Sequence, residues 1–148
     1  MKLLEVLYGW IIGSKSDFTR PFRESETVLV QANKFWDKLD SLSLFILILF
    51  VIIGIMLASN YYGPFNNKPG RHYRPRYWFM FMLATMIMSF VLTIIVECIL
   101  CPPRLGGALM LEFKIALGNS IYAIVTYFLA SFIWCNFLPT NACRILKI

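Results

Sequence analysis

The stretch that decides the fold reads SLSLFILILFVIIGIMLAS, residues 41–59, and it contains no charged side chain. Two further stretches share this property, Tyr77–Val96 and Ser120–Leu138. An α-helix rises about 1.5 Å per residue, so a helix of about 20 residues crosses the roughly 30 Å hydrocarbon layer of a bilayer. The sequence therefore predicts three transmembrane helices, at 41–59, 77–96 and 120–138.

Composition indicates the same class, because 59% of the 148 residues are hydrophobic and only 15% are charged. A domain of that composition in water would expose large apolar patches and aggregate. In lipid the backbone must pair internally, so each span is either a helix or a strand of a closed barrel. Barrel strands alternate apolar and polar residues, whereas residues 44–53 are apolar throughout. We therefore expect an all-α membrane protein, with a membrane domain over 41–138.

The N-terminal segment, residues 1–40, carries six basic and six acidic side chains and is expected to be amphipathic. Leu3–Ile12 is apolar but short, and no small-residue cleavage site follows it, so we do not expect a cleaved signal peptide. Two interpretations remain open. It is an interfacial helix with Tyr8 and Trp10 at headgroup level, or a helix packed on the rest of the protein. Ser25 offers an N-cap for a second amphipathic helix that leads into the first span, with a bend near Asp40.

The first connection, residues 60–76, contains Gly63-Pro64, Pro69, Gly70 and Pro75, and this pattern predicts irregular backbone. It also contains four of the basic residues and no acidic one. Basic and aromatic residues beside a span are ordinary topological signals and an aromatic belt. The sharper interpretation is a binding site for anionic lipid or an acidic protein partner. Its candidate residues are Lys68, Arg71, His72, Arg74, Arg76, Tyr77 and Trp78.

Membrane orientation does not follow from the basic residues. On the side of the N-terminal segment and the second connection, five basic residues lie near the membrane, and six lie near it on the other side. A dozen residues beside a membrane also make a small footprint for nucleic acid, so we expect no nucleic-acid partner.

The second predicted span contains polar residues at every fourth position, Thr85, Ser89, Thr93 and Glu97, which we call the polar ladder. This spacing places all four on one side of a helix. Intramembrane acids are often functional, so the ladder could line an ion or proton path. Hydrogen bonding between helices is the interpretation we favour, because Glu97 lies near the predicted helix end.

The third predicted span contains small residues on one face, and small residues allow helix backbones to approach closely in lipid. The first span has a shorter version of the pattern. The candidate helix-packing residues are Gly54, Ala58, Ala116, Ser120, Ala123, Tyr127, Ala130 and Ser131. We expect the second and third spans to face protein and the first to face lipid over most of its surface, except near Gly54 and Ala58.

Pro102-Pro103 should end the second span. Residues 105–117 are too short to cross a membrane, and we expect an interfacial or re-entrant helix there, with a possible break at Gly118-Asn119. Residues 139–148 form a short basic tail.

The four cysteines form no expected metal site, because Cys98 and Cys101 belong to the opposite end of the membrane domain from Cys135 and Cys143. Free thiols are expected, with a local disulfide between the first two as the alternative. Catalysis needs several acid–base groups in one pocket, and the chain has one histidine and, beyond the first span, only Glu97 and Glu112 as acids. The only candidate cluster of acid–base groups is formed by these two acids and Arg104. We expect no catalytic residue, metal or cofactor.

The sequence thus predicts a non-catalytic integral membrane subunit that acts as an oligomeric anchor or scaffold of a larger membrane-associated complex. Secretion, respiratory and defence assemblies all use such subunits, and the layout carries no motif that assigns residue roles. Its expected partners are the lipid bilayer, possible anionic lipids, further copies of the chain and other proteins, in a bacterial or organellar inner membrane. The alternatives are a small oligomeric pore lined by the second span and, third, a lipid-acting membrane enzyme.

Overall fold

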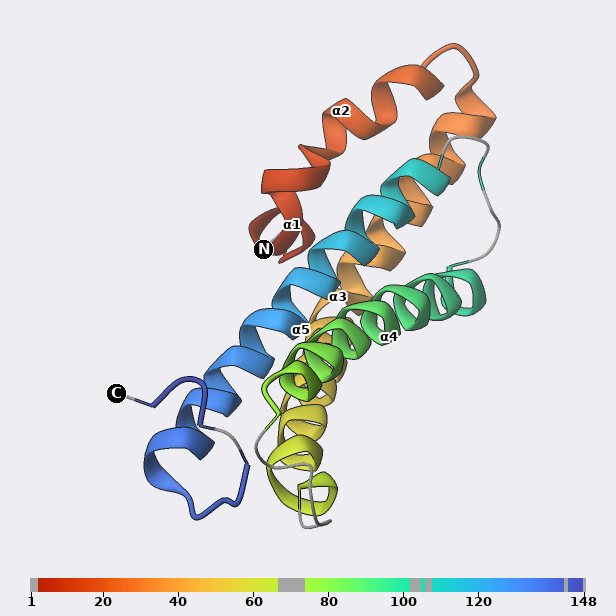
Figure 1. Cartoon of the computed structure of the whole chain (residues 1–148). Coiled ribbons are helices and arrows are strands. Elements are labelled where there is room, and N and C mark those ends of the chain that lie inside the picture. Colours follow the sequence, from red (N-terminus) through yellow and green to blue (C-terminus); the bar gives the residue numbers. More distant parts are fainter. Residues whose placement is uncertain (1–2, 67–73, 102–104, 106–107, 143, 148) are drawn as a thin grey trace. The chain divides into compact units, whose positions relative to one another are not determined.

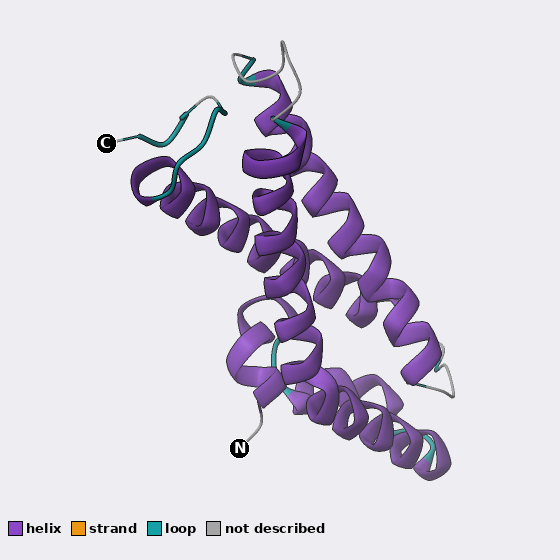
Figure 2. Ribbon diagram, turned by 90° about the horizontal axis from the view of Figure 1, so that it is seen from below, coloured by secondary structure: helices purple, strands orange, loops and turns teal. Residues whose placement is uncertain are grey.

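The computed structural model of the chain describes residues 3–66, 74–101, 105, 108–142 and 144–147. Within this part the only regular elements are helices (Figures 1 and 2). In chain order they are α1 (Leu3–Ile12), α2 (Lys15–Thr19), the 3-10 turn η1 (Arg20–Phe22), α3 (Glu26–Asn60), the π-helical turn η2 (Tyr61–Phe65), α4 (Arg76–Leu100) and α5 (Leu109–Phe137).

Three of these helices are long and apolar enough to cross a membrane: α3 together with η2, then α4, and then α5. This agrees with the three stretches expected from the sequence and fits a multi-pass integral membrane protein. The helices extend beyond the uncharged stretches, because polar residues can continue a helix into the headgroup region and into water.

The first span has no separate approach helix. Helix α3 runs for 35 residues from Glu26 to Asn60, and the expected bend position at Asp40 lies inside it. Beyond Asn60 the helix continues as the π turn η2, which contains Pro64. The expectation of irregular backbone from residue 60 is therefore wrong for residues 61–65. A single wide turn is a common way for a helix to accommodate an irregularity such as a proline.

The region before the third span also differs from the expectation. Helix α5 begins at Leu109 and passes through Gly118-Asn119 to Phe137 without a break, so residues 109–117 are part of one long helix. Gly118 has a packing role, because a Cβ there would lie 3.0 Å from the Tyr8 ring. Glycine and asparagine have low helix propensity, but tertiary contacts can compensate for it. Here Gly118 contacts α1, and Asn119 bonds to both α1 and α4.

The three long helices differ in how much of their surface the chain itself buries, and the order differs from the expected one. In the most apolar window of each helix, 50% of residues are buried in α5, 33% in α3 and 17% in α4. Within the chain itself, the second span is therefore the least buried of the three, although the sequence predicts that it faces protein as the third span does. The four-residue spacing of the ladder defines one narrow strip, and only that strip needs a protein neighbour.

The chain divides into two compact units. Unit 1 comprises Met1–Ile48 and Phe90–Asn119, and unit 2 comprises Leu49–Ser89 and Ser120–Ile148. Unit 1 therefore contains α1, α2 and the charged start of α3, together with the end of α4 and the start of α5. Unit 2 contains the remaining parts of the three long helices and the C-terminal tail.

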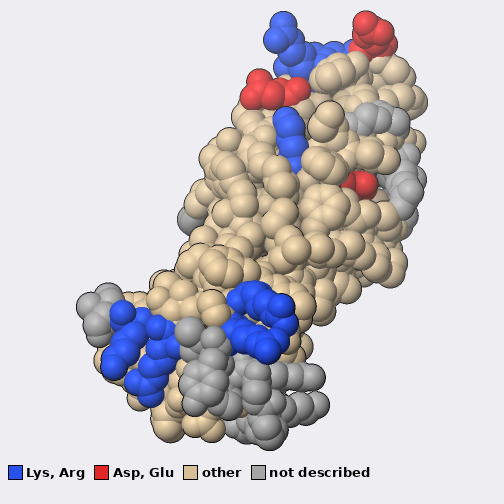
Figure 3. All heavy atoms as spheres, in the orientation of Figure 1, with Lys and Arg blue, Asp and Glu red and all other residues tan. Residues whose placement is uncertain are grey.

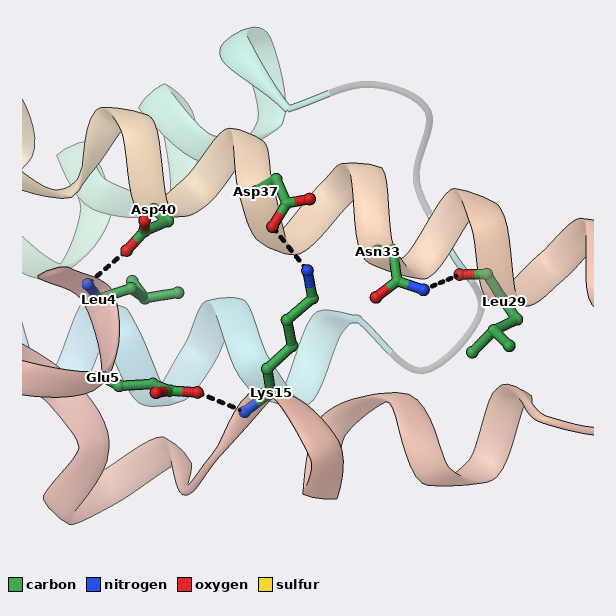
Figure 4. A network of polar contacts seen from close by, with 7 residues as sticks. All are labelled: Leu4, Glu5, Lys15, Leu29, Asn33, Asp37 and Asp40. Carbon is green, nitrogen blue, oxygen red and sulfur yellow. Dashed lines mark hydrogen bonds and ion pairs between the residues drawn. The ribbon is translucent and has the colours of Figure 1, made fainter. Parts of the chain in front are cut away.

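In unit 1 the N-terminal segment is fastened to α3 by charged side chains (Figure 4). The Leu4 amide donates to the Asp40 carboxylate at 2.7 Å, and the Lys15 ammonium pairs with the Asp37 carboxylate at 2.6 Å. The Lys15 amide donates to the Glu5 carboxylate at 2.8 Å. Helix α1 buries Leu4, Tyr8 and Ile12 while Trp10 stays 60% exposed. Of the two interpretations of this helix, packing on the protein accounts for the buried face.

In unit 2 a cluster of buried aromatic rings surrounds the junction of the long helices. Tyr61, Tyr62, Trp78 and Tyr127 are its ring-bearing members, packed with small residues and Cys135. The Trp78 indole N–H donates to the Ser131 hydroxyl at 3.1 Å, and the Tyr127 hydroxyl donates to the Trp78 carbonyl at 3.1 Å. The polar atoms of these two large side chains are thus paired inside an apolar cluster.

Candidate functional site

All four residues of the polar ladder are on the buried side of α4. Thr85, Ser89, Thr93 and Glu97 each have 0% of their surface exposed. The opposite side of α4 exposes large apolar side chains at Leu83, Ile87, Val91, Ile95 and their neighbours. Helix α4 therefore presents hydrocarbon outward and its polar groups inward, as a span surrounded by lipid requires.

The ladder residues of unit 1 extend into a buried polar chain that joins three helices. The Asn119 side-chain amide on α5 donates to the Thr93 hydroxyl on α4 at 3.2 Å. The Tyr8 hydroxyl on α1 donates to the Asn119 side-chain oxygen. The sequence indicated Asn119 only as part of a possible helix break, and it placed Tyr8 at headgroup level in one of two open interpretations. The signal that could have found them is a polar amide inside an apolar helix, because such a group must find a partner.

Beyond Thr93 this polar region ends at two carboxyl groups. Glu97 is wholly buried and Glu112 is 4% exposed. Both oxygens of Glu97 and one of Glu112 are buried without a hydrogen-bond partner. Arg104, which the sequence placed with these acids, lies outside the described residues.

Cys101 lies beside the two acids and is 2% exposed. Burial, and then the neighbouring Glu97 and Glu112, raise the pKa of the Cys101 thiol to about 11. The thiol is therefore protonated at neutral pH and a poor nucleophile. Cys101 and Cys135 are free thiols, and Cys143 is outside the described part.

In unit 2, two hydroxyl groups near the ladder donate to backbone carbonyls. The Thr85 hydroxyl donates to the Phe81 carbonyl of its own helix at 2.8 Å. The Ser120 hydroxyl of α5 donates to the Met86 carbonyl of α4 at 3.2 Å. These bonds satisfy hydroxyl groups locally and join α5 to α4.

The small residues on α3 and α5 are buried. Seven of the candidate helix-packing residues are at most 9% exposed. Ala130 is 9% exposed, and at most 1% is exposed in the others: Ala58, Ala116, Ser120, Ala123, Tyr127 and Ser131. At Gly54 the α3 backbone approaches α5 so closely that a Cβ would lie 2.7 Å from the Ala123 carbonyl oxygen. Glycine is required at this position for the two helices to keep their separation in unit 2.

The basic connection is described only in part, because Lys68, Arg71 and His72 lie outside the described residues. Arg74 and Arg76 are exposed, and the Arg76 guanidinium lies 5.0 Å from the centre of the Tyr77 ring. Trp78 was expected with them at the surface, but it is buried and bonded to Ser131. It is two residues beyond Arg76 in the helix and so falls on a different side of α4.

No group of three or more histidine, cysteine, aspartate or glutamate side chains in the described part is arranged to hold a metal ion. Comparison of the chain with protein-family models, curated proteins and solved structures gives no match. The buried carboxyl groups, the polar chain and the basic surface are therefore the features from which a function has to be inferred.

Proposed function

We propose that the chain is a non-catalytic integral membrane subunit that acts as an oligomeric anchor or scaffold of a larger membrane-associated complex. The observation that carries this proposal is the inward orientation of every ladder residue on α4. The polar groups hold helices together, and the surface left for the surroundings is apolar within the membrane. A bacterial or organellar inner membrane is the proposed location, and a secretion, respiratory or defence assembly is the proposed context.

Association between copies is supported by the small share of the spans that the chain itself buries. Only 17% of the α4 window is buried. Its exposed face carries long apolar side chains that pack equally well against lipid or against a neighbouring helix. We therefore include homo-oligomerisation in the proposal, with α4 as the helix that has most surface to offer.

The surface proposed for protein partners is the N-terminal part of unit 1. Arg20, Arg23, Glu24 and Glu26 are exposed there on η1, the following turn and the first residue of α3. The bonds of Lys15 to Asp37 and of Leu4 to Asp40 fix this segment on α3 (Figure 4). A charged surface held in place loses little entropy when a partner binds, and its mixed charges can select that partner.

The proposed contact with anionic lipid lies in unit 2. Figure 3 shows lysine and arginine atoms together at the lower part of the view, with no acidic atom among them on that face. The described basic residues of this unit are Arg74, Arg76, Arg144 and Lys147, and the unit contains no aspartate or glutamate in its sequence. Phosphate groups of lipid headgroups are suitable ligands for such a surface.

Purification from the native host tests the anchor proposal. The tagged chain, produced at its natural level, is extracted in mild detergent, and the mass of the particle is measured after subtraction of the detergent. We expect a particle that contains more than one copy together with other proteins in fixed ratio. The variant Arg20→Glu/Arg23→Glu should lose those proteins, whereas Arg144→Glu/Lys147→Glu should keep them. A single copy without partners would contradict the proposal.

A pore lined by the second span is the second candidate, and the ladder is its only support. Lining would require the ladder to face a lumen, but all four residues are buried within one chain. We therefore expect proteoliposomes with the wild-type chain, Glu97→Gln and Thr93→Val to show the same background ion flux. Flux above background in the wild type that either variant reduces would reverse the order of the two candidates.

A further inference from the structure

The two buried carboxyl groups of unit 1 lie on neighbouring turns of different helices. Glu97 is one turn after Thr93 on α4, and Glu112 is about two turns before Asn119 on α5. Because Asn119 bonds to Thr93, the two helices are joined one to two turns away from the acids. The Phe90 ring of α4 also packs on the Phe113 ring of α5, with 5.2 Å between the ring centres, so the two helices lie side by side along the stretch that carries both acids.

Neither side chain finds a protein donor that would stabilise a negative charge. Three of the four carboxyl oxygens are buried without a hydrogen-bond partner. An isolated carboxylate in an apolar interior is very unfavourable, and two at short distance are worse, because like charges repel most strongly where the dielectric constant is low. Something other than the described side chains must neutralise at least one of these groups.

The charged side chains on the helices around the acids supply no counter-charge. On α3, Lys38 is exposed and Asp40 accepts a hydrogen bond from the Leu4 amide. On α5, Lys114 is half-buried and lies two residues from Glu112, so the two side chains are on different sides of the helix. On α1 the Tyr8 hydroxyl is used by Asn119. Cys101, at the end of α4, is buried and protonated at neutral pH. A protonated thiol and a lysine directed to water do not supply a counter-charge inside the site.

The kind of ligand follows from the number of acidic groups. Divalent metal ions usually take three or more protein ligands, and no such group of acidic, histidine or cysteine side chains is present in the described residues. Two carboxyl groups that share one small site are commonly satisfied by a single proton, which forms a hydrogen bond between the oxygens and leaves one negative charge on the pair.

We propose that Glu97 and Glu112 form an intramembrane proton-binding site, in which one proton is shared between the two carboxyl groups at the end of the Tyr8–Asn119–Thr93 chain. The proton is held at neutral pH because burial disfavours the doubly charged pair. The hydroxyl and amide groups of the chain hold α1, α4 and α5 together around the site. The site lies wholly within unit 1 and does not depend on conduction across the membrane.

Infrared spectroscopy of the wild-type protein in lipid is the direct test. We expect a C=O stretching band of a protonated carboxylic acid at neutral pH, with the downshift that deuterium exchange gives, and its loss at alkaline pH. This measurement needs no variant, so it stands even if a substitution prevents folding. Absence of the band at neutral pH would overturn the proposal.

Variants then assign the band to the pair. Glutamine is nearly isosteric with glutamic acid, so Glu97→Gln and Glu112→Gln should each move the band, and the double variant should abolish it. The exposed control Glu24→Gln should leave it unchanged. A band that Glu112→Gln does not move would show that the proton is not shared. A band that disappears at constant pH when sodium is added would show a sodium site instead. Either result would overturn the inference.

Discussion

Both compact units of this chain bury polar groups, but they bury different kinds of polar group. Unit 1 contains eight basic and eight acidic residues, and unit 2 contains six basic and no acidic ones, which accounts for the 14 basic and 8 acidic residues of the chain. The whole net charge of +6 therefore belongs to unit 2. Yet unit 1 buries carboxyl groups, whereas the charged residues of unit 2 that the structure describes are exposed, and unit 2 buries hydroxyl and indole groups.

This difference distinguishes buried polar groups that packing explains from buried polar groups that suggest a function. In unit 2 the buried Trp78 and Tyr127 each donate a hydrogen bond, so their polar atoms are explained by packing alone. In unit 1 the oxygens of Glu97 have no such partner. Proteins rarely keep an unpaired buried acid without a use for it, which is why the site inference comes from unit 1 and the lipid inference from unit 2.

The largest expected effect concerns the charge of unit 2. Neutralising Arg74, Arg76, Arg144 and Lys147 to glutamine should weaken binding of anionic lipid, by up to about 4 kcal/mol at about 1 kcal/mol per basic residue. The measurement is the enrichment of anionic over neutral lipid in particles purified from a mixed bilayer. A matched set in unit 1, the exposed residues Arg20, Arg23, Lys34 and Lys38, should have little effect when changed in the same way. Equal losses from both sets would remove the distinction between the units.

A side chain at Gly54 should disrupt the packing of α3 against α5 in unit 2. Alanine there would bring its Cβ to 2.7 Å from the Ala123 carbonyl oxygen, and backbone cannot move aside as a side chain can. We expect Gly54→Ala to lower the free energy of unfolding by about 1 to 3 kcal/mol. The matched control is Gly63→Ala, where nothing beyond the local backbone and the two adjacent residues lies within 4 Å of the added Cβ. Thermal unfolding in detergent compares the two variants, and similar midpoints would argue against the close approach.

The polar chain of unit 1 should depend on Asn119. Asn119→Leu keeps the volume but removes the partner of the Tyr8 hydroxyl and a donor to Thr93. We expect a loss of about 1 to 2 kcal/mol, since both remaining groups stay buried. Asn33→Leu is the control, because the Asn33 side-chain amide donates to the Leu29 carbonyl of its own helix and joins no second helix in Figure 4. Hydrogen exchange of α1 should rise in the first variant and stay unchanged in the second.

The smallest expected effect concerns an exposed acid of unit 1. Hydrogen bonds from Ser14 hold the pKa of Asp17 below its ordinary value of 3.8. The charged carboxylate therefore stabilises the start of α2 above that value, and this contribution is lost as the pH falls through the lowered pKa. Amide protection in α2 should decrease at acid pH in the wild type. It should be low and independent of pH in Asp17→Asn, and a wild type without pH dependence would contradict the capping role.

Much of the architecture was predictable from local sequence. The three spans follow from length and the absence of charge. The burial of the ladder strip follows from its four-residue spacing, because a helix places such residues on one side. The small residues of α5 are buried for a related reason: they leave room for another helix where bulky side chains would not.

Other features were not predictable, because they depend on neighbours that are distant in sequence. Gly118 and Asn119 look like a helix break until the Tyr8 ring and hydroxyl are placed against them. Trp78 looks like a headgroup anchor until Ser131 is placed beside its indole. Pro64 looks like the end of a helix, yet a single π turn carries the helix past it to Phe65.

The sequence by itself determined that the chain has three apolar helices long enough to cross a membrane, because their length and lack of charge fit a bilayer and unpaired backbone is costly in lipid. Tertiary structure alone decided which polar residues are satisfied. Glu97 and Glu112 are 15 positions apart in the chain. Only the packing of α4 on α5 within unit 1 brings them to the same region and leaves three of their four oxygens buried without a hydrogen-bond partner.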